Sequence, residues 1–309
     1  MGTIYSDHGA LFLLRACRET GIIDALLGAA KTPEAVAEET GITERAAKTA
    51  LATLADIGYA SDSGGEYRAT QRLRGFDPAT PVAERGMIPH RLDILENYLA
   101  LPDLMRTGEY PEPDAADLEN YVAGMATIEE NVVRSAVTAA EHAHPRPERV
   151  LDVGGGIGRF AREFAQRGAA VTLLDDPAVI ELAESRLSGT GIETRGGDAV
   201  ASLPDGYDLA FCGRLTVSMS PDENEQLFGN LYDALEPGGT AACMEYVRDR
   251  SAVGPLFGFH MLAMSPTGNT YTAEQYRSWL TDAGFVGASV DEVPGTDFQI
   301  VTGHKPENE

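Results

Sequence analysis

Three alternating glycines after a short apolar run are the residues of this chain best suited to hold a ligand. The run Arg149–Val153 predicts a buried strand, and Gly154, Gly156 and Gly158 follow it before a stretch with helical spacing. Glycines suit such a turn because a ligand can lie against bare backbone and because the turn needs dihedrals that a Cβ forbids. The pattern is not the dinucleotide fingerprint G-x-G-x-x-G, since its last glycine comes one residue early and Arg159 stands where that motif has glycine.

Acidic side chains stand near the ends of the predicted strands. Asp152 lies two residues before the first glycine, and Asp175 closes the second strand. A carboxylate at the position of Asp175 can accept hydrogen bonds from both hydroxyls of a ribose. Gly197-Asp198-Ala199 follows the third strand, and each of these aspartates taken alone could be a turn or helix-cap residue. At this spacing and beside the glycine turn, together they predict a cofactor site.

The elements that must position these residues alternate between strand and helix patterns from residue 147 onward. Such alternation predicts an α/β fold with a doubly wound, largely parallel sheet and with ligands at the carboxyl ends of its strands. The last two strands are joined by a short connection through Pro294-Gly295, so they must be antiparallel to each other. The expected strands are Arg149–Val153, Ala170–Leu174, Ile192–Arg195, Tyr207–Cys212, Gly239–Val247, Gly287–Val293 and Phe298–Gly303, and the expected helices end at Gly168 and Leu187 or cover Asp222–Leu235 and Ala273–Ala283.

The N-terminal part carries a different pattern, which indicates a mostly α-helical domain. Apolar residues at helical spacing cover residues 10–30, with an interruption at Gly21, and two further helices begin at the caps Thr32 and Thr43. A Ser-Gly-Gly turn inside residues 59–70 predicts a hairpin, which completes a winged-helix pattern. DNA binding is disfavoured, because acids outnumber bases in residues 1–74 and the would-be recognition helix offers few bases. A dimerisation role is therefore preferred for this domain.

A helical connector joins the two parts of the chain. Helical periodicity covers Met87–Met105 and Leu118–His142, with the proline-rich breaker Gly108–Pro113 between them. The sequence thus predicts a dimerisation domain, a helical connector and an α/β domain, at residues 1–80, 81–146 and 147–309.

The net charge of the chain limits the classes of partner that it can bind. Among 309 residues, Asp and Glu outnumber Lys and Arg by 48 to 24, and the net charge of −24 is spread over both halves. Such a field disfavours nucleic acids and anionic membranes, because binding phosphates requires a positive surface. Acidity with arginine retained and lysine nearly absent resembles the halophilic proteins of salt-loving archaea, where salt screens the self-repulsion. An acidic protein from a GC-rich genome is the alternative.

Three further observations favour an intracellular, cytoplasmic protein. No run approaches the roughly 20 apolar residues of a membrane span. The N-terminus has no basic region of the kind that begins a secretory signal. Cys17, Cys212 and Cys243 are odd in number and far apart, so they support neither a disulfide framework nor a metal site.

The order acidic-x-G-x-G-x-G that begins at Asp152 resembles motif I of the class I S-adenosylmethionine (SAM) methyltransferases. The segments TGIIDALL, TPEAVAEETGI and LATLADIGYASDSGGEYRAT are similar to the N-terminal domain of the plant-type (caffeate/acetylserotonin-like) O-methyltransferases and their microbial relatives. EPGGTAACMEYV and NTYTAEQYRSWLTDAGF resemble that family's fifth strand and late helix, so the resemblance covers nearly the whole chain. It implies a Rossmann-like methyltransferase sheet, SAM as cofactor and S-adenosylhomocysteine (SAH) as product. It also implies a homodimer in which the N-terminal domain closes the partner's substrate pocket, and a connector at residues 81–146 that contributes to that pocket.

The resemblance also assigns residues to the cofactor. In that family the aspartate after the second strand binds the ribose, and the aspartate after the third strand meets the adenine amine. The residue that follows this second aspartate lies over the adenine ring. Carried over to this sequence, the cofactor-binding residues are Asp152, Gly154, Gly156, Asp175, Asp198, Ala199, Gly213 and Arg214.

The catalytic residues depart from the family pattern. O-methylating members have a histidine general base after the fourth strand, and counting back from Asp222-Glu223 places Ser218 at that position. A serine without a partner is not a base near neutral pH. The acidic residue before the late helix is replaced at Thr270, whereas Glu245 at the end of the fifth strand is retained.

Three interpretations of this departure stay open. The acceptor can need little help from a base, as a carbon or nitrogen nucleophile or an ionised oxygen would. His260 can supply the base from another element, although a purely structural histidine is the alternative. SAM can be bound without being consumed, in an apolar pocket suited to a flat or polyene molecule. The pocket residues are Met125, Phe257, His260, Met261 and Met264.

The sequence therefore predicts a SAM-dependent methyltransferase that acts on a small hydrophobic metabolite, with Ser218, Glu245 and His260 as the candidate catalytic residues. The alternative is a SAM-binding protein of the same fold without methyl transfer, either a cyclase- or hydroxylase-like enzyme or a ligand sensor. A winged-helix transcription regulator is a third possibility, which the charge disfavours.

Overall fold

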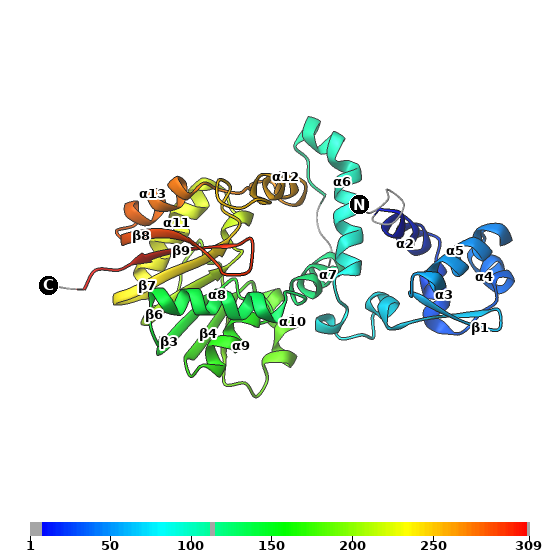
Figure 1. The fold of residues 1–309 in the computed structure, drawn as a ribbon, viewed down its shortest axis with the longest axis horizontal. Helices are drawn as coiled ribbons and strands as arrows, with labels where there is room; N and C mark the ends of the chain where they lie inside the picture. The colour runs from blue at the N-terminus through cyan, green and yellow to red at the C-terminus, as the bar shows by residue number, and fades with distance from the viewer. Residues whose placement is uncertain (1–7, 112–114, 308–309) are drawn as a thin grey trace. The chain divides into compact units, whose positions relative to one another are not determined.

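The computed structural model describes residues 8–111 and 115–307, apart from the side chain of residue 185. The chain forms two compact units (Figure 1). Unit 1 comprises residues 1–99 with 113–127, and unit 2 comprises residues 100–112 with 128–309. The division after residues 80 and 146 rests on the sequence pattern and stays a prediction.

Helices and a hairpin form the first part of unit 1. Two of the helices begin at capping side chains, since the Thr32 hydroxyl accepts a hydrogen bond from the Ala35 amide and Thr43 accepts one from the Ala46 amide. The helices and hairpin lie where the sequence predicts them, whereas their winged-helix arrangement stays a prediction. The elements are α2 (Gly9–Glu19), α3 (Ile22–Gly28), α4 (Pro33–Thr40), α5 (Glu44–Asp56), β1 (Ala60–Ser63) and β2 (Glu66–Ala69), followed by the short helices η1 (Gln71–Phe76) and η2 (Val82–Glu84).

The helices that follow are α6 (Ile88–Thr107), α7 (Ala115–Met125) and α8 (Glu130–Ala143). The sequence predicts one helical stretch over Leu118–His142, and this is wrong, because the structure separates α7 from α8. Thr127 ends α7 by donating its amide and its hydroxyl to the carbonyl of Gly124 (3.1 and 2.7 Å), and Glu129 then takes an extended conformation. A side chain that competes for helix carbonyls thus overrides the periodicity. Part of the predicted breaker, at residues 112–113, lies outside the described residues.

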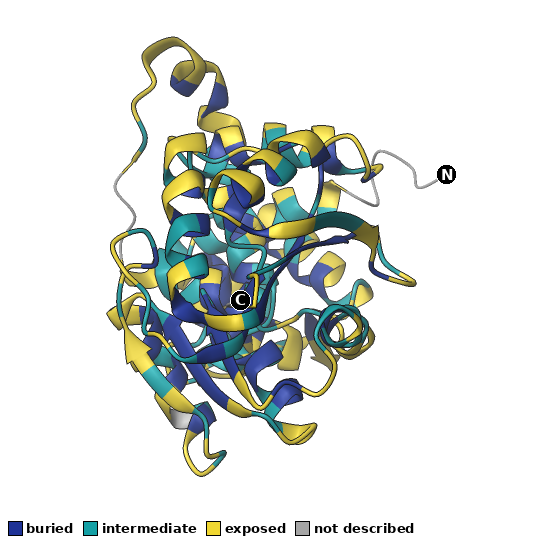
Figure 2. Cartoon of the chain, turned by 90° about the vertical axis from the view of Figure 1, so that its left-hand side faces the viewer, coloured by how far each residue is buried: buried dark blue, intermediate teal, exposed yellow. Residues whose placement is uncertain are grey.

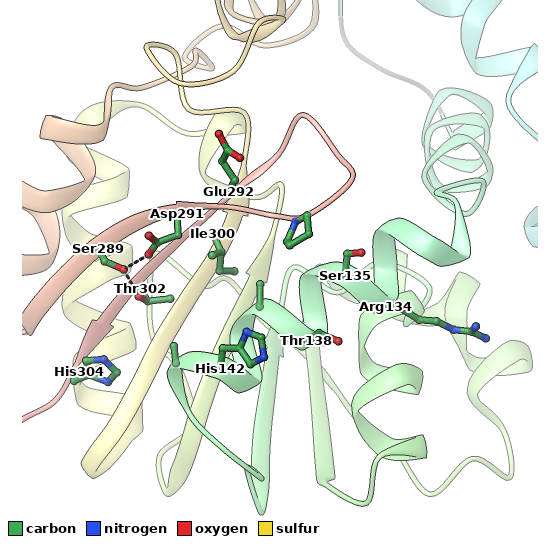
Figure 3. Close-up of a pocket in the computed structure, with 13 residues that line it drawn as sticks. Arg134, Ser135, Thr138, His142, Ser289, Asp291, Glu292, Ile300, Thr302 and His304 are labelled. Atoms are coloured by element: carbon green, nitrogen blue, oxygen red, sulfur yellow. Dashed lines mark hydrogen bonds between the residues drawn. The ribbon is translucent and has the colours of Figure 1, made fainter.

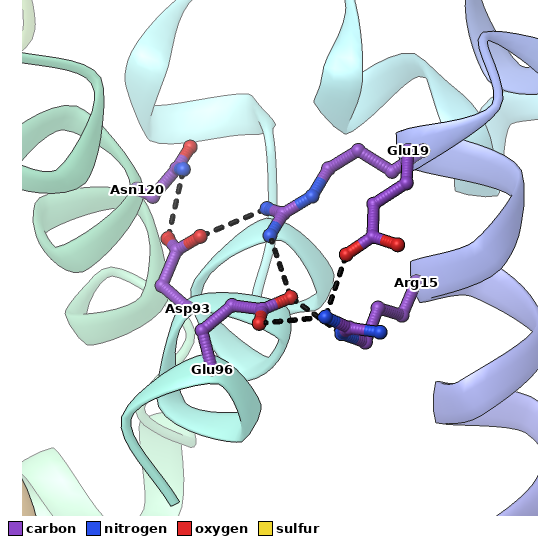
Figure 4. Close-up of polar contacts among 6 residues, drawn as sticks. Arg15, Glu19, Asp93, Glu96 and Asn120 are labelled. Atoms are coloured by element: carbon purple, nitrogen blue, oxygen red, sulfur yellow. Dashed lines mark hydrogen bonds and ion pairs between the residues drawn. The ribbon is translucent and has the colours of Figure 1, made fainter. Parts of the chain in front are cut away.

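Ion pairs join α2 to the first half of α6 within unit 1 (Figure 4). Arg15 Nε lies 2.7 Å from Glu96 Oε1, and Arg18 Nη1 lies 2.9 Å from Asp93 Oδ1. The second oxygen of Asp93 accepts a hydrogen bond from Asn120 Nδ2 of α7 (2.9 Å). These charged side chains are partly buried, so solvent screens them less than it screens fully exposed pairs. The network therefore links three helices that are distant in sequence.

The described residues of unit 2 form a seven-stranded sheet in the order β5-β4-β3-β6-β7-β9-β8. The strands from β3 to β7 pair in parallel, and β9 runs antiparallel to both β7 and β8. This arrangement confirms the predicted doubly wound sheet with a terminal antiparallel hairpin. The strands are β3 (Arg149–Val153), β4 (Ala170–Asp175), β5 (Glu193–Gly196), β6 (Tyr207–Gly213), β7 (Leu235–Glu245), β8 (Val286–Glu292) and β9 (Gln299–His304).

Helices cover both faces of this sheet (Figure 1). On one face Phe228 of α11 stacks on Trp279 of α13, with ring centroids 6.0 Å apart. On the other face Phe164 of α9 lies against Phe211 of β6, with centroids 5.4 Å apart. The strands between the two layers are mostly buried (Figure 2). The helices are α9 (Arg159–Gln166), α10 (Pro177–Leu187), α11 (Pro221–Ala234), α12 (Gly254–Met264) and α13 (Ala273–Asp282), with the short helix η3 (Thr216–Ser218) after β6.

The sequence analysis does not predict α12, because its residues are almost all apolar and leave no helical periodicity. No helix within the described ranges is long and apolar enough to cross a membrane. The same ranges hold no group of three or more His, Cys, Asp or Glu side chains arranged to bind a metal ion. Cys17, Cys212 and Cys243 are buried free thiols.

The substitution Leu231→Ala tests the packing of α11 on the sheet. Leu231 is fully buried, so we expect the free energy of unfolding to fall by about 2–5 kcal/mol in urea denaturation followed by circular dichroism. The matched control Leu256→Ala truncates a side chain that is 73% exposed and should change the free energy by less than about 0.5 kcal/mol. Equal losses in the two variants would contradict this assignment of the core.

Candidate functional site

Of the three alternating glycines in the turn after β3, only one has open space where a Cβ would lie. Gly154, Gly156 and Gly158 all have positive φ, at 67°, 56° and 76°. A Cβ at Gly154 would lie 2.8 Å from Leu215, and one at Gly158 would lie 2.6 Å from Leu187, so both positions are closely packed. A Cβ at Gly156 would meet nothing within 4 Å. The backbone of Gly156 is therefore the part of the turn against which a ligand can lie.

Asp175 ends β4 directly beside this turn. Its Oδ2 accepts a hydrogen bond from the Gly156 amide (2.7 Å), and its Oδ1 accepts one from the Asp176 amide (2.7 Å). Burial raises the pKa of Asp175, and the two amides act in the opposite direction. An ionised carboxylate has about four lone-pair sites, so acceptor capacity is left for two further donors. The structure thus brings together the two strongest elements of the predicted cofactor site.

Asp152 lies beneath the turn and is fully buried. Its Oδ2 accepts a hydrogen bond from the Ala161 amide in the first turn of α9 (2.9 Å), while its Oδ1 has no hydrogen-bond partner among the described residues. Burial raises the pKa of Asp152 to about 7. A Cβ at Gly155 would lie 2.7 Å from this carboxylate. In this structure Asp152 therefore holds the turn to α9, and its contact with a cofactor stays a prediction.

Asp198 follows β5 and is exposed at the same edge of the sheet. Its Oδ1 accepts a hydrogen bond from the Val200 amide (2.8 Å), which closes a tight turn. Ala199 is buried, and its carbonyl accepts a hydrogen bond from Asn230 of α11 (2.8 Å). Asp198 thus presents a carboxylate on a turn that a helix holds in place.

Gly213 and Arg214 end β6 at this edge. A Cβ at Gly213 would lie 2.7 Å from the Phe160 ring, so the position requires glycine. Arg214 has a φ of 64°, and its amide donates a hydrogen bond to the carbonyl of Met244 on β7 (2.9 Å). The chain therefore bends sharply where the sequence places the next cofactor contacts.

Glu245 is fully buried at the end of β7 and braces η3. Its Oε1 accepts hydrogen bonds from the amide (2.9 Å) and the hydroxyl (2.7 Å) of Thr216. The Thr216 hydroxyl also lies 2.7 Å from the Tyr276 hydroxyl of α13, which donates to it because the proton of Thr216 is engaged by Glu245. Burial raises the pKa of Glu245 to about 7. The predicted catalytic acid is thus enclosed within a buried hydrogen-bond chain.

The two positions where the sequence analysis expects replaced catalytic residues carry hydroxyls that bond to the backbone. Ser218 is exposed at the end of η3, and its hydroxyl donates to the carbonyl of Leu215 (2.7 Å). Thr270 is buried, and its hydroxyl donates to the carbonyl of Gly254 (2.9 Å). Neither side chain can take up a proton near neutral pH. The hydroxyl of Ser218 is therefore engaged with the backbone, and its catalytic role stays a prediction.

The predicted pocket residues of α12 lie on different sides of that helix. Phe257 has its ring centroid 5.2 Å from that of His260, and both belong to an aromatic group at the end of β7. Met261 is buried with its methyl group near Gly268, beside η3. Met264 packs instead with a small cluster from the second half of α6. Met125 ends α7 in unit 1, so its place in the pocket stays a prediction.

Sequence reasoning missed Tyr246, which follows β7. Its ring stacks on Phe298 (centroids 4.1 Å apart) and lies 4.8 Å from the ring of Phe257. The place of Tyr246 directly after a strand that ends at the ligand edge was the available signal. Thr216 and Tyr276 carried no such signal, because only the fold places them beside Glu245.

Figure 3 shows a cavity of about 500 Å³ between α8 and the β8–β9 hairpin. Its lining contains none of the site residues that the sequence predicts. Beside it the Thr240 hydroxyl lies 3.1 Å from His144 Nδ1 and 3.0 Å from His304 Nδ1. The cavity lacks the pairing of glycine backbone with carboxylate seen at the carboxyl edge of the sheet. We therefore assign the candidate site to that edge.

The sequence is similar to those of known O-methyltransferases. Residues 107–286 match the model of the O-methyltransferase domain family. The chain is 28% identical over 305 residues to 3-hydroxy-5-methyl-1-naphthoate 3-O-methyltransferase of Streptomyces sahachiroi, covering 88% of this chain and 84% of that protein. It is 25% identical to mitomycin biosynthesis 6-O-methyltransferase of Streptomyces lavendulae, covering 86% and 82%.

Two solved structures have the same fold. PigF with SAH superposes with a TM-score of 0.74 at 20% identity, covering 96% of each chain. Human N-acetylserotonin methyltransferase in complex with SAM superposes with a TM-score of 0.69 at 20% identity, covering 99% of this chain and 100% of that one.

The substitution Glu245→Gln tests the buried carboxyl. The pKa of Glu245 is raised from 4.5 to about 7, so its stabilising contribution is complete below the unfolded value and is lost as the pH rises through the folded value. The glutamine cannot ionise. We expect the unfolding free energy of the variant relative to wild type to rise by up to about 3 kcal/mol between about pH 5 and pH 8 in urea denaturation.

The matched control is Glu236→Gln, which changes an exposed carboxyl on the same strand. Its stability relative to wild type should not depend on pH in this window. A flat difference for Glu245→Gln as well would show that Glu245 stays ionised in the folded protein.

Proposed function

Because the chain belongs to the O-methyltransferase domain family, we propose that it transfers the methyl group of SAM to a small hydrophobic metabolite. The observation that carries this proposal is the Asp175 carboxylate on the Gly156 amide, beside the open face of the glycine turn. That pair offers a carboxylate to ribose hydroxyls and bare backbone to the amino-acid part of the cofactor. Methyltransferase activity with SAM follows from the family and from this geometry together.

The residues of the site fit SAM. Asp175 would hold the ribose, Asp198 and Ala199 would hold the adenine, and the backbone around Gly154 and Gly156 would hold the methionine part. The bound cofactor supplies an electrophilic methyl group on a sulfonium. The protein contributes the position of the acceptor in line with that methyl group and the exclusion of water.

The acceptor must reach its reactive form without the histidine base of the family. The hydroxyls of Ser218 and Thr270 donate hydrogen bonds to backbone carbonyls. The carboxyl of Glu245 is fully buried and accepts hydrogen bonds from Thr216. Two relatives are named for aromatic hydroxyl acceptors that also carry a carboxylate. They are the 3-hydroxy-5-methyl-1-naphthoate 3-O-methyltransferase described above and 3-amino-4-hydroxybenzoate 4-O-methyltransferase of Streptomyces cremeus. They support an aromatic hydroxyl as the acceptor group of this protein. We propose His260 as the general base; its ring centroid lies 5.2 Å from that of Phe257.

The hydroxyls of Ser218 and Thr270 favour a second candidate function. A protein that binds SAM without consuming it, as a cyclase- or hydroxylase-like enzyme or a ligand sensor, needs no base at Ser218 or Thr270. The two functions differ in the affinity for the demethylated product, because an enzyme that releases SAH after each turnover has a site that fits SAH as well as SAM.

We also propose a homodimer formed through the N-terminal domain, in the cytoplasm. The described part of that region exposes Phe12 on α2, at 50%, which is apolar area that a second copy can cover. The net charge of −24 argues against nucleic-acid or membrane partners.

Isothermal titration of the purified protein with SAM and then SAH, in high salt, tests the proposed function. Methyl transfer predicts that both bind and that SAH binds at least as tightly as SAM. Tight SAM with much weaker SAH would favour the non-methylating function, and no binding of either would reject the cofactor site. An acceptor screen with hydroxylated aromatic acids follows the first outcome.

The substitution Asp175→Asn should weaken SAH binding by about 10- to 100-fold, because hydrogen bonds to a charged group contribute about 1.5–3 kcal/mol. The matched control Asp205→Asn removes the same charge at an exposed position of unit 2 and should leave the affinity unchanged. Equal affinity in both variants would contradict the role assigned to Asp175.

A further inference from the structure

Three arginines form a cluster where α9 begins and α10 ends. Arg159 and Arg162 stand three residues apart at the start of α9, so their side chains lie on one face of that helix. Arg186 belongs to the last turn of α10. The two helix ends are in contact, because a Cβ at Gly158, the residue that caps α9, would lie 2.6 Å from Leu187. The fold therefore brings guanidinium groups from two helices together.

The charges of this arginine cluster repel one another. Burial lowers the pKa of the Arg186 guanidinium, and the charges of Arg162 and Arg159 lower it further. All three residues are only partly exposed, so solvent screens the repulsion less than it would at the open surface. A guanidinium stays protonated under ordinary conditions, so the cluster cannot relieve the repulsion by releasing a proton.

Carboxylates of the protein neutralise little of this charge. Glu130 Oε2 lies 3.1 Å from Arg159 Nη2, but the other oxygen of the same carboxylate lies 3.4 Å from Arg134 Nε, so two arginines share it. Between residues that the structure describes, no ion pair or hydrogen bond engages the guanidinium of Arg162 or Arg186. The cluster is therefore a positive site in a chain that has twice as many acids as bases.

Buried donors point to a ligand for this positive site. The Nε atoms of Arg159 and Arg186 are buried, and they have no hydrogen-bond partner in the described part of the chain. Buried N–H groups of native proteins are almost always paired with protein, water or an ion, so these two donors require a partner. A guanidinium presents its donors in a planar fork that matches the oxygens of phosphate and sulfate.

We propose that the arginine cluster binds a small oxyanion of the phosphate or sulfate type between α9 and α10. The net charge of −24 disfavours the phosphates of nucleic acids and anionic membranes, so the ligand is the free ion or a small phosphorylated or sulfated metabolite. None of the three arginines is among the residues assigned to the cofactor. The proposal therefore goes beyond methyl transfer and does not depend on it.

The position of the cluster gives the bound anion a structural effect. Arg159 follows the glycine turn directly, and its Nη2 donates a hydrogen bond to the carbonyl of Ile128 before α8 (2.8 Å). An oxyanion that accepts hydrogen bonds from both helices holds the start of α9 against the end of α10. It thereby stabilises the helix that leaves the cofactor turn.

Isothermal titration of the full chain with sodium phosphate, in sodium chloride at constant ionic strength, tests the proposal. We expect the wild type to bind phosphate. Arg162→Gln and Arg186→Gln should each weaken this binding by about 10- to 100-fold, because each removes hydrogen bonds to a charged group. Arg162→Lys retains the charge without the planar fork and should recover part of the affinity.

The matched control is Arg250→Gln, which removes the same charge from an exposed position of unit 2 and should leave the phosphate affinity unchanged. Circular dichroism shows whether each variant is folded. Urea denaturation in phosphate and in chloride gives a second measurement. Phosphate stabilises folded proteins in general, so the quantity compared is the gain in the urea midpoint, which should be larger in the wild type and Arg250→Gln than in Arg162→Gln and Arg186→Gln.

Three results would overturn the proposal. They are a wild type that does not bind phosphate, equal phosphate affinity in the wild type and both cluster variants, and displacement of phosphate by SAH, which would assign the cluster to the cofactor. Phenyl phosphate, titrated in the same way, separates the two sources of the anion. Tighter binding of this ester would identify a phosphorylated metabolite as the ligand, and weaker binding would identify the free ion.

Discussion

The hydrogen bond from the Gly156 amide to the Asp175 carboxylate is the contact on which the site depends. It joins the turn after β3 to the end of β4, so the two neighbouring strands present backbone and carboxylate at one point. The closely packed positions at Gly154 and Gly158 hold the turn from either side and leave only Gly156 open. The doubly wound sheet thus brings its ligand-binding groups together through backbone geometry before any long side chain contributes.

A buried chain of hydrogen bonds lies at the end of β7, near the same edge of the sheet. Glu245, Thr216 and Tyr276 connect β7, η3 and α13, and none of them is exposed. Glu245, which resembles a catalytic residue of the family, holds η3 against β7 through its hydrogen bonds to Thr216. The charged group that extends from the sheet edge toward α12 is instead Arg214, whose main chain lies in the strained left-handed region.

Much of the fold could be predicted from the sequence, because short-range rules determine it. Apolar runs indicated the central strands β3, β4, β6 and β7, and capping threonines marked α4 and α5. The break between α7 and α8 was missed because Thr127 competes locally for a helix carbonyl, and α12 was missed because a helix apolar on every side has no periodicity. The hydrogen-bond chain Tyr276–Thr216–Glu245 and the positive φ of Arg214 arise from tertiary contacts. Local patterns in a single sequence do not reveal such contacts.

The two fully buried carboxyls at Asp152 and Glu245 make folding a proton-uptake reaction. Each has a pKa of about 7 in the folded chain, against 3.8 and 4.5 for the same groups in water. In mildly acidic solution the folded protein therefore retains protons that the unfolded chain releases, and the buffer must absorb them. The apparent enthalpy of unfolding then includes the heat of protonating the buffer, so calorimetry in phosphate and in an amine buffer would give different values for the same molecular event.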